Sequence, residues 1–263
     1  MKKLFIFSLL LASITMMAAE LKPQRVLVLG DDPMMVSDES NAAVGYATML
    51  QPLFDEAVTV DVQASAQLLP ADAAELFSPA QKGDIVLLCK LPVEENVSSD
   101  RTMSDVYFHQ LVPIVQAAKK KGVKLIMLTP VCPRYFTPEG AQVHRFGSSP
   151  EVVRRLCRRD GITLIDLEQL SFDWLNLIGL EASAEMFVPV VPASPVQAKK
   201  AAREGNLLTQ PGAERVAALV TEAIRTDKKN ALNQRLRTAT AESAQPAAAA
   251  EPAETDENSE TAE

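Results

Sequence analysis

The stretch that decides the fold is residues 124–136, which read KLIMLTPVCPRYF. Its first half is a continuous apolar run, which predicts a strand buried on both faces, and Pro130 ends that strand. The expected strand covers Lys124–Thr129, and the residues after it follow the carboxyl end of a strand, where open α/β sheets place their ligand sites. The residues that follow each further strand are candidates for a functional site.

Four more apolar runs of this kind occur along the chain, and helical patterns separate them. The runs are Arg25–Gly30, Ala57–Val62, Asp84–Cys89 and Thr163–Asp166. The helical patterns cover Ala43–Phe54, Ser104–Lys121, Pro150–Arg159 and Gln210–Arg225. Alternation of strand and helix predicts right-handed crossovers and a parallel five-stranded sheet with helices on both faces. The expected body is one three-layer α/β/α domain over residues 20–226.

The N-terminus is predicted to lie outside this domain. Lys2 and Lys3 precede a short apolar run, Leu4–Ile14, and the small residues Ala18-Ala19 follow it. This pattern is typical of an export signal, here residues 1–19, and it predicts a periplasmic or secreted protein. A retained membrane anchor is the alternative, but the run is short for a membrane span. No later stretch reaches about 18 consecutive apolar residues, so no span is expected after cleavage.

Residues 227–263 are predicted to form a disordered acidic tail. From Glu242 to the end there are seven acids and no base, and residues 239–263 include no aromatic or large aliphatic side chain. Without those acids and the two N-terminal lysines, the net charge falls from −8 to −3. A nearly neutral body argues against nucleic-acid binding. Because of the basic residues between Arg225 and Arg237, two alternatives stay open: this end of the chain is a tether, or it makes an electrostatic contact with a partner.

The three cysteines, Cys89, Cys132 and Cys157, indicate no cofactor. Their spacing fits no zinc pattern, and an odd number leaves at least one of them unpaired. Cys89 and Cys132 follow neighbouring strands and could approach each other, although small buried thiols are expected. The chain has no Asp-x-Asp-x-Asp-Gly calcium loop. We therefore expect no metal and no other cofactor.

Several segments resemble the rhamnogalacturonan acetylesterase branch of the SGNH (GDSL-like) hydrolases. A strand that runs into Thr-Pro-Val, followed by an arginine before an aromatic residue, is similar to that branch. So are residues 144–150 (HRFGSSP), 161–167 (GITLIDL), 185–188 (EMFV) and 210–213 (QPGA). Residues 26–31 (VLVLGD) stand where the family has its nucleophile strand, and Gly45-Tyr46 stands where the family usually has Gly-Trp. The resemblance covers nearly the whole body in order and implies the flavodoxin-like SGNH fold.

The same resemblance implies that the catalytic positions are substituted. The family has its serine nucleophile after Gly-Asp, where this chain has Asp32. The glycine of the second block falls at Ala66, and the asparagine of the oxyanion hole falls at Val93. The aspartate and the histidine fall at Glu204 and Leu207. A carboxylate lacks the hydroxyl that forms an acyl-enzyme, and leucine accepts no proton. These substitutions together predict a pseudoenzyme.

The candidate residues of the cleft leave three functions open. They are Asp31, Asp32, Glu94, Asn96, Arg134 and His144. The first function is a non-catalytic module that binds a carbohydrate or an envelope protein in the inherited cleft. The second is a carbohydrate-ester hydrolase with rebuilt acid–base chemistry, using strand-end carboxylates and His144. The third is an envelope scaffold whose basic helix end and acidic tail make the functional contacts.

Two apolar features near these candidates are expected to be structural. Met34 and Met35 should make the pocket at the nucleophile position apolar, because thioethers alone bind hard ions poorly. Trp174, the only tryptophan, is expected in the core of the domain, and a platform for sugar stacking is the alternative.

Overall fold

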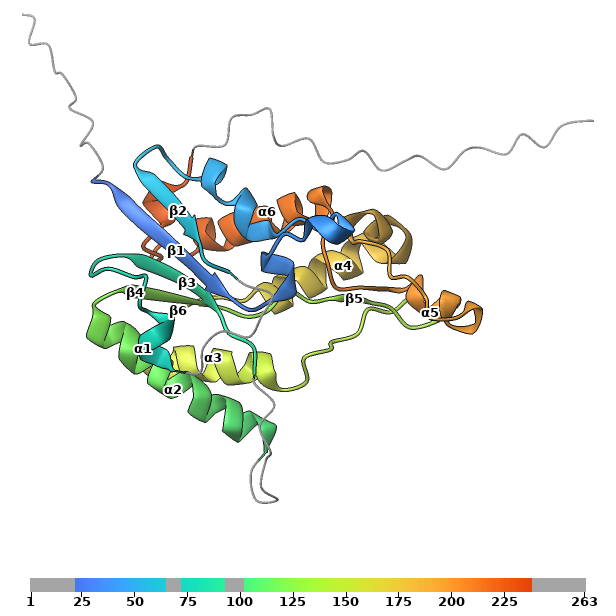
Figure 1. Ribbon diagram of the computed structural model, residues 1–263, viewed down its shortest axis with the longest axis horizontal. Helices are drawn as coiled ribbons and strands as arrows, with labels where there is room; N and C mark the ends of the chain where they lie inside the picture. Colours follow the sequence, from blue (N-terminus) through green and yellow to red (C-terminus); the bar gives the residue numbers. More distant parts are fainter. Residues whose placement is uncertain (1–21, 65–71, 93–101, 238–263) are drawn as a thin grey trace, which may run out of the picture.

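A parallel five-stranded sheet forms the centre of the computed structural model, which describes residues 22–64, 72–92 and 102–237 (Figure 1). The strand order is β2-β1-β3-β4-β6. These strands are Val58–Val62, Gln24–Gly30, Ile85–Cys89, Lys124–Leu128 and Thr163–Ile165. The predicted three-layer α/β fold is confirmed, and the order is the flavodoxin-like one. The chain places β2 on one side of β1 and the later strands on the other side, so the strand order reverses between β1 and β3.

Different helices cover the two faces of the sheet (Figure 1). One face carries α4 (Leu167–Ser183) and α6 (Gln210–Thr226). The other carries α1 (Ala73–Leu76), α2 (Met103–Lys121) and α3 (Ser149–Asp160). Successive residues of β1 point to opposite faces, so Val26 and Val28 pack into one core and Leu27 and Leu29 into the other. Burial on both faces explains why each strand is a continuous apolar run.

The prediction of an α-helix over Ala43–Phe54 is wrong. The segment forms two short 3-10 turns, Tyr46–Met49 and Gln51–Leu53. Pro52 lacks the backbone N–H that a continuous helix needs. Gly45 lies so close to the backbone of Met35 that a Cβ there would stand 2.2 Å from the carbonyl oxygen of Met35. Close packing against the end of β1 therefore sets the path of this segment.

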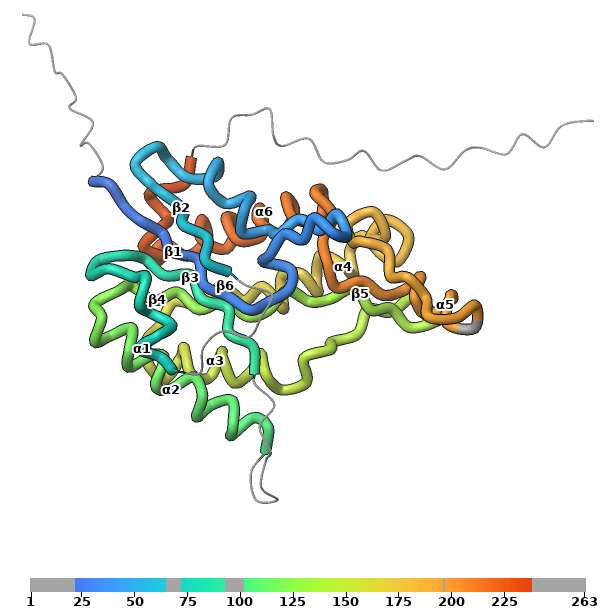
Figure 2. The backbone as a smooth tube through the Cα atoms, in the orientation of Figure 1, coloured from blue at the N-terminus to red at the C-terminus, as the bar shows by residue number. Residues whose placement is uncertain are grey.

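A small antiparallel sheet lies beside the main one. It consists of β5 (Arg134–Tyr135) and β7 (Glu204–Gly205), and α5 (Ala198–Ala201) precedes β7. Figure 2 shows the green segment that contains β5 running beside the orange segment around α5, although the two are far apart in the sequence. The other 3-10 turns are Pro33–Met35, Glu39–Asn41, Ala184–Met186, Pro195–Gln197 and Asn233–Arg235.

Residues 227–237 belong to the folded domain, so the prediction that a disordered tail starts at residue 227 is wrong for them. Leu232 is fully buried, and Leu236 forms a β-bridge with Phe54. Arg235 donates a hydrogen bond to the carbonyl of Lys22. The two leucines supply the apolar surface that residues 239–263 lack, and this anchors the segment. The predicted signal peptide and the chain from residue 238 onward lie outside the described residues.

The remaining apolar predictions are confirmed. Trp174 is 6% exposed, and its ring lies 6.5 Å from that of Phe187 inside the core. Met34 and Met35 are buried beside the end of β1. All three cysteines are buried free thiols. Within residues 22–64, 72–92 and 102–237, no helix has the length and apolar character needed to span a membrane.

Candidate functional site

A buried ion pair fills the point where the strand order reverses. Asp31 follows β1 and Lys90 follows β3, and the Nζ of Lys90 lies 2.6 Å from Oδ2 of Asp31. Both side chains are at most 2% exposed. The backbone N–H of Leu91 donates to the other oxygen of Asp31 at 2.6 Å, and the hydroxyl of Tyr107 donates to the carbonyl of Lys90. Open α/β sheets bind ligands at this point, but here the two charges satisfy each other.

Asp32, at the position that the resemblance assigns to the nucleophile, acts as a structural cap. Its side chain is 1% exposed. One carboxylate oxygen accepts from the backbone N–H of Met34 and the other from that of Val131, each at 2.9 Å. Burial raises the pKa of Asp32 to about 6, and the two backbone donors offset only part of this effect. The carboxylate therefore ties the end of β1 to the turn after β4.

The positions that the resemblance assigns to the catalytic aspartate and histidine lie in and just after β7. Glu204 pairs with Tyr135 across the small sheet, and its carboxylate lies 3.8 Å from the Nζ of Lys200. Leu207 is partly buried, and its carbonyl accepts a hydrogen bond from Val188 at 2.9 Å. Leu207 has no group that takes a proton, so it supplies no base to Asp32.

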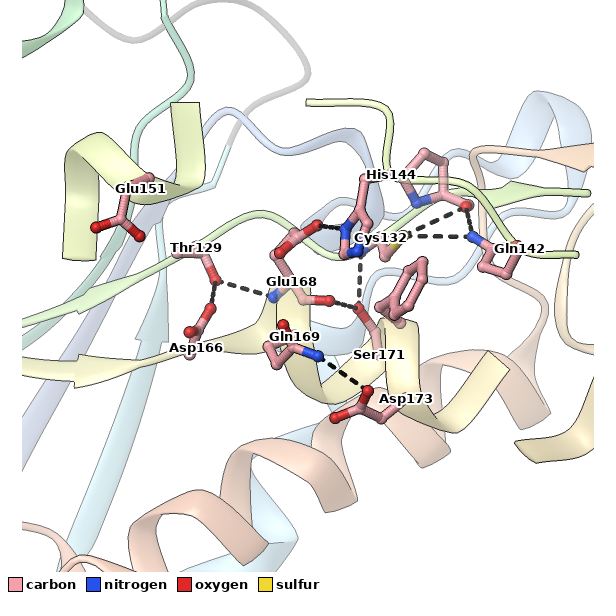
Figure 3. A network of polar contacts seen from close by, with 12 residues as sticks. Thr129, Cys132, Gln142, His144, Glu151, Asp166, Glu168, Gln169, Ser171 and Asp173 are labelled. Carbon is pink, nitrogen blue, oxygen red and sulfur yellow. Dashed lines mark hydrogen bonds and ion pairs between the residues drawn. The ribbon is translucent and has the colours of Figure 1, made fainter. Parts of the chain in front are cut away.

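A second polar cluster lies at the carboxyl ends of β4 and β6 (Figure 3). The hydroxyl of Thr129 donates to Asp166 and accepts from the backbone N–H of Glu168, both at 2.9 Å. Arg154 of α3 donates to both oxygens of Asp166, at 2.7 and 2.9 Å, and to Glu168 at 2.7 Å. The hydrogen bond to Asp166 is the largest cause that raises the pKa of Arg154. These bonds fix the first turn of α4.

His144 lies against this cluster through two contacts (Figure 3). Its Nδ1 is hydrogen-bonded to Oε1 of Glu168, and its ring stacks on Phe172 with centroids 3.7 Å apart. The side chain of Glu168 is 3% exposed, whereas that of His144 is 48% exposed. An imidazole whose Nδ1 faces a buried carboxylate has its Nε2 free to accept a proton. The pair thus has the arrangement of a general base and its orienting acid.

Figure 3 also places Cys132 and Ser171 near His144, but neither is suited to be a nucleophile. The hydroxyl of Ser171 is fully buried, donates to the carbonyl of Leu167 and accepts from the backbone N–H of Cys132 at 2.7 Å. Burial raises the pKa of the Cys132 thiol to about 12, so it stays protonated and unreactive. In the part of the chain that the structure describes, no hydroxyl or thiol is hydrogen-bonded to His144.

Arg134, a predicted cleft residue, lies in β5 and is 4% exposed. Its guanidinium donates to the hydroxyl of Ser183 at 2.9 Å and to the carbonyls of Ala202 and Leu180 at 2.8 Å. None of these three partners is among the hydrogen-bond partners of Asp32 or His144 described above. Arg134 therefore joins β5 to the end of α4 and to α5.

The predicted positions Ala66, Val93, Glu94 and Asn96 lie outside the described residues. The other four candidates do not come together in one site. Asp31 is paired with Lys90, and Asp32 is bonded to backbone N–H groups. His144 is bonded to Glu168, and Arg134 to Ser183 and backbone carbonyls. Over residues 22–64, 72–92 and 102–237, no group of three His, Cys, Asp or Glu side chains could hold a metal ion.

Four residues that hold these candidates in place are absent from the predicted site: Lys90, Arg154, Asp166 and Glu168. Three of them have a signal in the sequence, because Lys90 and Asp166 each directly follow a strand and Glu168 comes two residues after Asp166. Arg154 has no such signal, since its place on α3 becomes meaningful only when α3 packs beside β6.

Solved structures with a similar fold include the protein YxiM of Bacillus subtilis, with a TM-score of 0.56 and 20% identity over 78% of this chain and 57% of the other. This chain thus spans little more than half of that protein. The acetyl xylan esterase AlAXEase matches with a TM-score of 0.49 and 15% identity, over 76% of this chain and 98% of its own.

A GDSL-like lipase of Bacteroides thetaiotaomicron matches with a TM-score of 0.39 and 16% identity, over 76% of this chain and 87% of its own. No protein-family model and no curated protein matches the chain. At such identities the likeness concerns the fold. The chain therefore shares the parallel α/β fold of YxiM, and the five-stranded order agrees with the fold expected from the sequence.

Proposed function

We propose that this domain is an exported, non-catalytic relative of the rhamnogalacturonan acetylesterase branch that binds a carbohydrate or an envelope protein. The observation that carries the proposal is the environment of Asp32. Both of its oxygens accept backbone hydrogen bonds, and the side chain is 1% exposed. A serine esterase needs an accessible hydroxyl at this place, hydrogen-bonded to a base. Asp32 offers neither.

The surroundings of Asp32 support the same proposal. Leu207 stands at the position of the base, and loss of a triad member costs a serine hydrolase several orders of magnitude in rate. The ion pair of Asp31 and Lys90 occupies the reversal point of the sheet. The scaffold of the family is therefore retained while its acyl-transfer groups are replaced, which favours binding over turnover.

Hydrolysis of p-nitrophenyl acetate tests the loss of activity. We expect the purified wild-type chain to release nitrophenol no faster than a heat-inactivated sample of the same preparation. The Asp32→Asn variant, which keeps the shape of the side chain, should give the same rate. Turnover by the wild type that disappears in Asp32→Asn would overturn the proposal, because Asp32 would then be catalytic.

The pair of His144 and Glu168 favours a second candidate, a hydrolase that activates water directly. Glu168 is buried and holds Nδ1 of the imidazole, while Arg154 holds the other oxygen of Glu168 at 2.7 Å. Such a pair is two thirds of a catalytic triad, and water in place of the serine would be deprotonated by Nε2. This function would make use of His144 without any role for Asp32.

Two variants separate the second candidate from the first. If His144 activates water, His144→Ala and Glu168→Gln both remove turnover while Asp32→Asn retains it. His109→Ala is the matched control, because His109 is the other histidine of the chain and lies exposed on α2. Equal rates in all of these proteins and in the heat-inactivated sample would eliminate the second candidate.

The proposed export depends on residues 1–19 and has its own test. Expression of the full chain in a bacterium, followed by fractionation and N-terminal sequencing, should give a periplasmic or secreted product that begins at Glu20. A cytoplasmic product that still carries Met1 would contradict export and leave the question of turnover unaffected.

A further inference from the structure

The small sheet carries a buried positive charge that has no carboxylate partner among the described residues. Arg134 is 4% exposed, and its three described acceptors, a hydroxyl and two carbonyls, are neutral. Burial lowers its pKa, and Glu181 opposes this only from longer range. An arginine remains protonated under such conditions. Three neutral acceptors hold this guanidinium in place but do not neutralise its charge, so an anion beside it would be stabilised.

A pocket of about 360 Å³ opens beside this arginine, between β5, β7 and α5. Arg145 also lines it, and its guanidinium lies 4.2 Å from the centroid of the Tyr135 ring. Lys200 lines it as well, and among the described residues its one ion pair is the loose 3.8 Å contact with Glu204. Three cations and one carboxylate thus line a pocket of a chain whose net charge is −8. Such a local field attracts anions.

The side chains of the pocket also define the shape of a suitable ligand. Arg134 uses three of the five N–H donors of a guanidinium on the described chain, and Arg145 makes no ion pair with a described residue. Guanidinium groups bind planar carboxylates and phosphates through paired hydrogen bonds. The stacked Tyr135 holds Arg145 in place without neutralising it. A volume of about 360 Å³ is enough for a small molecule.

We propose that this pocket binds a small polar molecule through a carboxylate or phosphate group, held by Arg134, Arg145 and Lys200. Arg145 directly follows His144, so the pocket lies next to the His144 and Glu168 pair along the chain. The anion site goes beyond the proposed function, because it does not depend on whether the domain hydrolyses esters.

Calorimetric titration at low ionic strength tests the site with three probes: glucuronate, glucose and inorganic phosphate. Glucose has a neutral hydroxymethyl group where glucuronate has its carboxylate and is otherwise the same sugar. We expect glucuronate or phosphate to bind and glucose not to bind, and the observed anion identifies which group the site prefers. Loss of one charge-assisted pair in Arg145→Ala should weaken binding about tenfold or more. Arg145→Lys, which keeps the charge and loses the fork, should weaken it less.

The control variant is Lys121→Ala, which removes the same charge from an exposed position at the end of α2. Its binding constant should change by less than about twofold, because exposed charges at a distance are screened. Absence of binding for both anions would overturn the proposal. So would equal binding of glucose and glucuronate, or equal weakening by Lys121→Ala and Arg145→Ala. None of these results bears on the esterase assay, so the two proposals fail independently.

Discussion

The burial of Asp32 makes the stability of the domain depend on pH. The pKa of this carboxyl is raised from 3.8 to about 6, because burial disfavours the charged form. In the unfolded chain the group loses its proton near 3.8, so between these values the folded state binds more protons. The contribution of Asp32 to stability is therefore fully present below pH 3.8 and is lost as the pH rises through 6.

The size of this effect follows from the two pKa values. One pKa unit corresponds to about 1.4 kcal/mol, so the full loss is about 3 kcal/mol. About 2 kcal/mol of it falls between pH 4 and pH 7. Asp32→Asn removes the titrating proton, although its amide nitrogen faces one of the two backbone N–H donors and costs one hydrogen bond at every pH. From pH 4 to pH 7, the unfolding free energy of the wild type should therefore fall by about 2 kcal/mol relative to that of the variant.

Urea unfolding at pH 4, 5, 6 and 7 measures this difference, with fluorescence of Trp174 as the signal. Trp174 is the only tryptophan and is 6% exposed, so its emission should report global unfolding. Asp173→Asn, at an exposed position of α4, is the control and should show no comparable shift. A difference between wild type and Asp32→Asn that stays constant from pH 4 to pH 7 would refute the reasoning.

Three further changes test packing and hydrogen bonding through unfolding in urea at pH 7. Leu232→Ala, at a fully buried position, should lower the free energy of unfolding by about 2–5 kcal/mol. Leu177→Ala, at a position 84% exposed, should be nearly neutral, and equal losses in the two variants would contradict the packing of residues 227–237. Thr129→Val leaves a buried backbone N–H without its acceptor and should cost about 1–3 kcal/mol, and Thr129→Ser should restore most of it. Gly45→Ala places a Cβ 2.2 Å from a backbone oxygen, so it should destabilise the protein more than Gly30→Ala, whose Cβ meets a flexible methionine side chain; the reverse order would contradict this.

The central sheet is the part of the fold that the sequence predicts best. Each of its five strands is found within one or two residues of its predicted bounds, because a strand buried on both faces is a continuous apolar run. The segment around Gly45 is different, since its path depends on contact with the backbone of Met35. Residues 227–237 are misread for a related reason. Leu232 and Leu236 stand in a polar context and gain their burial only from the rest of the fold.

The candidate site is predicted less completely than the sheet. Asp32 is visible in the sequence as an acid after the first strand, but its partner Val131 is 99 residues away and contributes a backbone N–H, which leaves no mark on residue type. His144 is visible as a loop histidine, and its partner Glu168 comes from a helix start 24 residues later. Such pairs arise from the order of the strands and the crossing of helices, so periodicity along the chain does not reveal them.

The packing of residues 227–237 also determines how the domain can be attached to other structures. Because Arg235 is bonded to Lys22 and Leu236 to Phe54, the first and last described residues meet at the amino-terminal edge of the sheet. The small sheet and α5 lie at the far end of the molecule (Figure 1). A fusion or surface linkage at either described end would therefore lie at the opposite end of the domain from the pocket between β5, β7 and α5. The same proximity makes the chain a good subject for circular permutation, with a short linker closing the old ends.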